Sequence, residues 1–78
     1  MNNYVLIDCG LIHQYLIKKE DIEKLEDETF YTVETVKDLS DYKIENKDDK
    51  LIFTKGSETL TFKKVAVDMY LKYALDEL

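Results

Sequence analysis

Residues 51–62 constrain the fold more than any other stretch, because they carry a β-hairpin pattern whose register can be read from the side chains. Gly56 and Ser57 make a Gly-X pair suited to a two-residue turn of type II′. A turn at this pair sets Lys55 opposite Glu58, and alternate side chains then fall on the same face. A slip of one residue would divide the apolar set between both faces, so we expect this register. The side chains that share the apolar face are Leu51, Phe53, Leu60 and Phe62.

A third strand is predicted immediately upstream of this hairpin. The polar run Asn-Lys-Asp-Asp that follows Glu45 has the composition of a turn. Folding the chain back there sets Glu45 opposite Lys50, and Tyr42 and Ile44 then join the apolar face. The sequence therefore predicts a three-stranded antiparallel meander at about residues 42–62, with one apolar side.

Residues 63–78 are predicted to form a helix that covers the apolar side of this meander. The segment contains no glycine or proline, and its apolar residues sweep an arc wider than one sheet face requires. We therefore expect part of the helix, including Tyr70 and Tyr73, to contact another layer of the domain or a second chain. Charged residues at intervals of four form a narrow polar stripe on the same helix: Lys64, Asp68, Lys72 and Asp76.

The N-terminal part is predicted to contain a strand and a helix. Residues 4–7 are a continuous apolar run, which is typical of a strand buried on both faces. Residues 11–26 favour a helix, because Ile22 and Leu25 continue the helical phase of the apolar residues before them. The alternative is a strand over 11–17 that closes a hairpin with the first strand.

The pattern at residues 29–39 fits either a strand or a short helix capped by Thr32. The 78 residues are expected to make a single compact domain (1–78), close to the size at which one core is just sufficient. The predicted fold class is α+β. In this fold a small antiparallel β-meander packs against a C-terminal helix, with an N-terminal strand and a helix around residues 11–26.

Composition excludes several classes of function. The chain has 17 acidic residues and 11 basic ones, all lysine, for a formal net charge of −6. Nucleic acids and anionic membranes would be repelled, and arginine, the best side chain for bidentate phosphate contacts, is absent. The single cysteine, Cys9, cannot form an internal disulfide, which indicates a cytoplasmic protein. No signal peptide or membrane-spanning segment is expected.

Acidic residues are concentrated in one part of the chain. Residues 20–45 contain ten acids and three lysines, whereas the rest of the chain has a net charge of +1. The six acids of residues 20–28, here called the acidic band, can present carboxylates to a basic surface. The plainer alternative is a solvated face that keeps the protein soluble. The predicted partner-binding residues combine this band with two tyrosines: Glu20, Asp21, Glu23, Glu26, Asp27, Glu28, Tyr70 and Tyr73.

No catalytic, metal-binding or cofactor-binding residue is predicted. Cys9 and His13 are four residues apart and would meet on one helical turn, but no third group is in place to orient them for nucleophilic catalysis. The pair also lacks further ligands at the spacing of a metal site. Gly56 is expected in a turn rather than a phosphate-binding loop, because no Lys-Ser/Thr follows it.

In size, charge and lack of arginine, the chain resembles the small phage-encoded inhibitors that block host nucleic-acid enzymes, some anti-CRISPR proteins among them. The resemblance implies a non-enzymatic, acidic binding protein that docks on a basic surface of a partner protein and imitates nucleic-acid phosphates. The partner would be a nucleic-acid-handling enzyme, with no direct binding to nucleic acid or membrane. The alternative is a small structural or regulatory subunit that forms a homodimer through the helix at 63–78.

Overall fold

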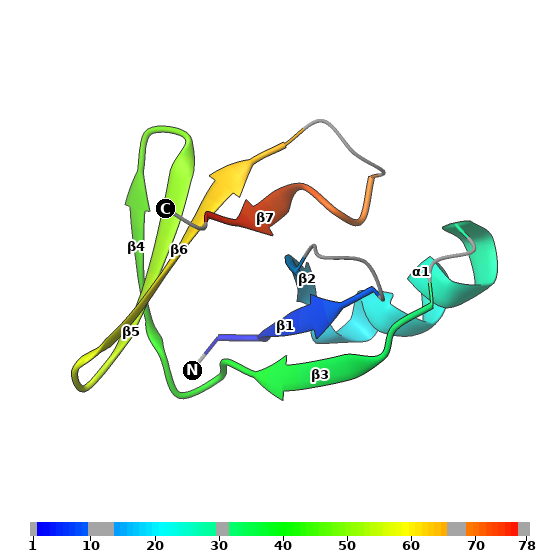
Figure 1. Cartoon of the computed structure of the whole chain (residues 1–78), viewed down its shortest axis with the longest axis horizontal. Helices are drawn as coiled ribbons and strands as arrows, with labels where there is room; N and C mark the ends of the chain where they lie inside the picture. Colours follow the sequence, from blue (N-terminus) through cyan, green and yellow to red (C-terminus); the bar gives the residue numbers. More distant parts are fainter. Residues whose placement is uncertain (1, 10–13, 30–31, 66–68, 77–78) are drawn as a thin grey trace.

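A computed structural model of the chain describes residues 2–9, 14–29, 32–65 and 69–76. Within them, a 7-stranded antiparallel sheet curls into a half-barrel (Figure 1), with strand order β3-β1-β2-β7-β6-β5-β4. A 3₁₀ turn, η1 (Lys19–Asp21), leads into one short helix, α1 (Ile22–Thr29). The strands are β1 (Tyr4–Asp8), β2 (Gln14–Lys18), β3 (Thr35–Asp38), β4 (Lys43–Lys47), β5 (Lys50–Lys55), β6 (Glu58–Lys64) and β7 (Tyr73–Leu75).

The predicted α+β architecture is wrong, because the C-terminal helix at 63–78 is not present. Lys63 and Lys64 complete β6, and Tyr73–Leu75 forms β7; residues 66–68 and 77–78 lie outside the described residues. β7 pairs with β2 on one side and with β6 on the other. A helix there would leave β2 and β6 as open edges, whereas the strand satisfies backbone groups on both. The helix through which self-association was expected is therefore not formed.

The hairpin of β5 and β6 has the predicted register. Lys55 pairs with Glu58, and Gly56 adopts the positive φ of +60° expected at the first position of the turn. The predicted pairing of β4 is wrong by two residues, because Glu45 lies opposite Ile52 and the turn falls at residues 48–49. A shift of two residues preserves the face of every side chain, so the apolar face of the meander is as expected.

The N-terminal strand is present, but the predicted helix at 11–26 is wrong over its first half. Residues 14–18 are a strand, β2, which forms an antiparallel hairpin with β1. Helix begins only at Ile22, and residues 10–13 lie outside the described residues. The strand alternative for this segment is thus the one observed, and residues 35–38 of the undecided segment are also a strand. Pairing on both sides of β1 and β2 outweighs the weak helical preference of single residues.

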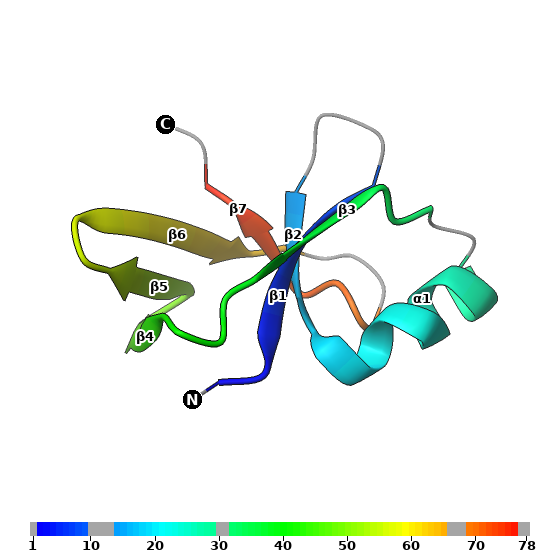
Figure 2. The same ribbon diagram turned by 90° about the horizontal axis from the view of Figure 1, so that it is seen from below.

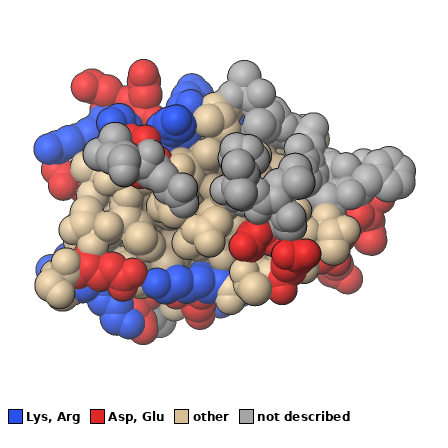
Figure 3. All heavy atoms as spheres, viewed as in Figure 1, with Lys and Arg blue, Asp and Glu red and all other residues tan. Residues whose placement is uncertain are grey.

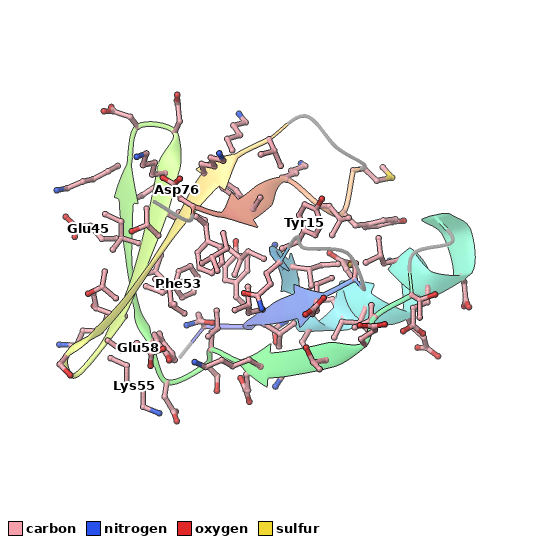
Figure 4. The ribbon with its side chains drawn as sticks, in the orientation of Figure 1. Tyr15, Glu45, Phe53, Lys55, Glu58 and Asp76 are labelled. Carbon is pink, nitrogen blue, oxygen red and sulfur yellow. The ribbon has the colours of Figure 1, made fainter. Side chains whose placement is uncertain are left out.

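In Figure 2, β1 and β2 lie between the meander and α1. Because side chains alternate along these two strands, they contribute to two separate hydrophobic clusters. The aromatic cluster lies between the meander and the first hairpin, where Phe53 points into the interior (Figure 4). Its buried residues are Leu6, Leu16, Leu39, Tyr42, Leu51, Phe53 and Phe62. The aliphatic cluster lies on the opposite face and consists of Val5, Ile7, Ile17, Leu25 and Leu71.

A polar cluster at the rim of the aromatic cluster joins β3 to the start of β6. The hydroxyl of Tyr42 donates a hydrogen bond to Oε1 of Glu58 over 2.5 Å, and Nζ of Lys37 lies 3.0 Å from the other carboxylate oxygen. The ammonium groups of Lys37 and Lys55 lie 5.8 and 5.7 Å from the centre of the Tyr42 ring. Hydrogen bonds from Tyr42 and Lys37 hold the pKa of Glu58 below its ordinary value.

Candidate functional site

The helix α1 presents much of the acidic band to solvent. Leu25 is fully buried in the aliphatic cluster, and Ile22 packs against the same cluster. At 3.6 residues per turn, Glu23 and, one turn later, Asp27 must then point away from the sheet. The exposed acidic side chains of η1 and α1 are Glu20, Glu23, Glu26 and Asp27. Glu28 lies in the last turn of α1, and its side chain falls outside what the structure describes.

On the face shown in Figure 3, the acidic side chains at the end that contains α1 have no lysines beside them, whereas acids and lysines are mixed at the meander end. Lysines lie mainly over the meander in the same view. Glu20 is held at the start of this region by a hydrogen bond from the side-chain amide of Asn3. The separation of charge along the molecule is therefore stronger than the net charge of −6 suggests.

A groove of about 180 Å³ lies between β2, η1 and the segment that leads into β7. The side chains of Leu16 and Ile17 contribute to its lining and also belong to the two buried clusters. The groove is also lined by three tyrosines, one methionine, two lysines and one aspartate: Tyr4, Tyr70, Tyr73, Met69, Lys18, Lys72 and Asp21. This set is called the tyrosine groove below.

The fold brings three of the predicted partner-binding residues together. Asp21, Tyr70 and Tyr73 all line the tyrosine groove, although Asp21 is about fifty positions away from the tyrosines in sequence. Pairing of β7 with β2 places the tyrosines beside η1. Glu23, Glu26 and Asp27 lie on the adjoining helix and do not line the groove. The predicted set is thus divided into a groove and an acidic border.

Six residues that line the groove are not in the set predicted from the sequence: the buried Leu16 and Ile17, and Tyr4, Lys18, Met69 and Lys72. Met69 is the most informative of them, because 71% of its surface is exposed. The expected helix at 63–78 places Met69 on its apolar arc, so the sequence pattern gives no signal of this exposure. The sequence pattern places Lys72 on the polar stripe of that same predicted helix.

The size and lining of the groove favour a polypeptide side chain over a cofactor. Sites for drug-sized ligands and cofactors usually occupy about 300–1,000 Å³, which is larger than this groove. Apolar and aromatic groups meet charged groups of both signs here, as they do where the centre of a protein–protein interface adjoins its polar border. Among the described residues, no group of His, Cys, Asp and Glu side chains is arranged to hold a metal ion.

Cys9 is half-buried at the end of β1, and His13 lies outside the described residues. Burial, and secondarily the neighbouring Asp8 carboxylate, raises the pKa of the Cys9 thiol. The thiol is therefore protonated at neutral pH, and only the thiolate is strongly nucleophilic.

Comparison of the chain with protein-family models, with curated proteins and with solved structures finds no match. In the part of the chain that the structure describes, no helix has the length and apolarity needed to cross a bilayer. Function must accordingly be inferred from the groove and the charged surface around it.

Proposed function

We propose that this chain is a non-enzymatic binding protein that docks on a basic surface of a partner protein. The observation that carries the proposal is the tyrosine groove beside the acidic band. Met69, exposed over 71% of its surface, and the half-buried Tyr70 and Tyr73 lie next to Asp21. Protein interfaces commonly combine an apolar, aromatic centre with a polar border, and methionine and tyrosine are enriched at the centre.

The acidic border favours a partner whose docking surface is positively charged. Glu23 and Asp27 are separated by one helical turn, which places their Cβ atoms about 5–6 Å apart on the exposed side of α1. Two carboxylates at this spacing suit lysine or arginine side chains that otherwise contact successive phosphates of a nucleic acid. A partner that handles nucleic acids therefore fits this border, and complementary charge would accelerate the encounter.

Affinity capture from a lysate of the source cells, over a series of salt concentrations, tests the proposal. The variant Glu23→Gln, Glu26→Gln, Asp27→Asn removes three exposed carboxylates from α1. We expect it to remain folded, to lose the captured basic protein and to lose the salt dependence of capture. Mass spectrometry of the retained protein then identifies the partner.

A matched control removes the same charge elsewhere. The variant Asp41→Asn, Asp48→Asn, Asp49→Asn changes three exposed carboxylates near the meander. It should retain the partner as the wild type does. If both variants lose the partner to the same degree, or if both retain it, docking through the acidic band is contradicted.

The apolar part of the site has its own test. Met69→Gln changes an exposed side chain, so folding should be unaffected. Its capture should weaken while the salt dependence stays that of the wild type, since no charge is altered. Unchanged capture by this variant would remove the groove from the interface.

A further inference from the structure

One edge of the sheet has features that suit pairing with a second copy of this chain. β3 and β4 are the two end strands, so each has one side without a neighbouring strand among the described residues. Lys47 and Lys50 flank the two-residue turn of the β4–β5 hairpin and form a hydrogen-bonded pair. Backbone groups alternate in direction along a strand. The N–H and C=O groups of Ile44 and Asn46 therefore point outward from β4.

The side chains of β4 also differ between its two faces. Ile44 lies on the same face as Phe53, its partner in β5, yet 41% of its surface is exposed. The apolar face of the meander thus reaches the sheet edge without being covered there. Lys43 and Glu45 are exposed on the opposite face.

We infer that β4 pairs antiparallel with β4 of a second copy about a two-fold axis at Ile44, which makes a homodimer with one continuous sheet. In this register Ile44 meets Ile44 of the second copy through reciprocal backbone hydrogen bonds. Lys43 lies opposite Glu45 of the second copy, and symmetry repeats the pair. Both pairs are in the closely spaced, non-hydrogen-bonded positions, where cross-strand ion pairs are strongest.

Charge excludes the competing two-fold register centred on Glu45. That register would place Glu45 opposite itself and Lys43 opposite Lys47, which are both repulsive arrangements. The β3 edge is also unsuitable. Leu39 donates its backbone N–H to the carbonyl of Tyr4, so the backbone N–H and C=O groups of Val36 and Asp38 point outward from β3. A two-fold register centred on Val36 would place Asp38 opposite Glu34 of the second copy, which is repulsive.

Long-range electrostatics permit the approach of two β4 edges despite the net charge of −6. Residues 42–64 contain six lysines and four acids, so this part of the chain is positive. The acidic band lies on α1, at the end of the molecule opposite the meander (Figures 1 and 2). Pairing of β4 would therefore keep the two acidic regions apart, and this inference does not depend on the proposed function.

Sedimentation velocity over roughly 10–500 μM protein tests the dimer, since short interfaces of this kind bind weakly. Wild type should approach twice the mass of 9.2 kDa as the concentration rises. Lys43→Glu and Glu45→Lys should each weaken self-association on the order of tenfold, because each turns two attractive pairs into repulsive ones. The double variant Lys43→Glu, Glu45→Lys should dimerise like the wild type.

Mixing supplies the sharpest result. An equimolar mixture of the two single variants should form a heterodimer, because every acidic side chain then faces a lysine. As a control, Lys63→Glu makes the same charge change as Lys43→Glu at an exposed position of β6, away from the edge, and should leave self-association unchanged.

Circular dichroism should show every variant folded, since Lys43 and Glu45 are exposed. A wild type that stays monomeric over the whole range would overturn the inference. A Lys43→Glu variant that dimerises normally would also overturn it. That result would indicate a register centred on Asn46, which pairs Glu45 with Lys47 and sets position 43 opposite Asp49 of the turn, outside β4.

Discussion

The two hydrophobic clusters share the strands β1 and β2 but are enclosed in different ways. Sheet lies on both sides of the aromatic cluster, where the rings of Tyr4 and Phe53 meet edge to face at 5.7 Å, and those of Phe53 and Phe62 at 5.3 Å. The aliphatic cluster is covered by the short helix α1 and by the segment that contains Leu71. Only the first is closed by continuous backbone pairing, so we expect it to be the more stable of the two.

This difference places the acidic band over the less constrained cluster, because the band lies mainly on α1. The tyrosine groove lies between the two clusters, since Tyr70 packs against the aliphatic cluster whereas Tyr4 and Tyr73 pack against the aromatic one. Binding sites are often formed by elements with low local stability, because these can adjust to a partner. The meander supplies the rigid part of the molecule.

The largest effect is expected from Phe53→Ala. Phe53 is fully buried and contacts two other rings, so its removal should lower the free energy of unfolding by about 3–5 kcal/mol. Urea denaturation measures the change, and Phe53→Leu, which retains much of the volume, should cost less. A loss below about 1 kcal/mol would show that the aromatic cluster is not the main core.

Leu25→Ala should have the next largest effect, about 2–4 kcal/mol, because Leu25 anchors α1 on the aliphatic cluster. Hydrogen exchange should separate the two clusters. Amides of α1 should lose protection in this variant well before those of β5 and β6. Loss of protection at the same rate throughout would mean that the two clusters unfold as one unit.

Gly56→Val tests the turn of the meander at a smaller scale. No atom lies within 4 Å of an added Cβ, so the cost arises only from the positive φ of +60°. For a β-branched residue this cost should be about 1–2 kcal/mol, and less for Gly56→Ala. Thermal melts measure these costs. Asp48, at a φ of 50° in the other turn, provides the comparison, since Asp48→Gly should be neutral or stabilising.

The smallest effect is expected at the rim of the aromatic cluster. The pKa of Glu58 is held below its ordinary value, so its contribution to stability is present above about pH 4.3 and is lost as the pH falls through the lower folded pKa. Glu58→Gln should therefore lose this small contribution at pH 7 and show a correspondingly smaller loss of stability in acid. Tyr42→Phe, which removes the donated hydrogen bond, should shift the acid transition in the same direction. Acid titrations that superimpose on the wild type would show that the rim contributes nothing to closure.

Part of the candidate site could be predicted before the fold was known. The exposure of Glu23 and Asp27 follows from the helical spacing of Ile22 and Leu25, which is a local property. The meeting of Asp21 with Tyr70 and Tyr73 does not, because it depends on pairing between β2 and β7. Residues so far apart in sequence leave no periodic signal of their contact.

Sequence by itself determined the elements whose partners are near in the chain. The β5–β6 register follows from turn chemistry and alternation, and the burial of residues 5–7 on both faces of β1 follows from their continuous apolar run. These are properties of a few neighbouring residues. Tertiary structure alone decided the state of residues 14–18 and 73–75, where apolar spacing also suits a helix. Each lies between two strands that would otherwise be open, and backbone pairing on both sides stabilises the strand more than a single helical face could.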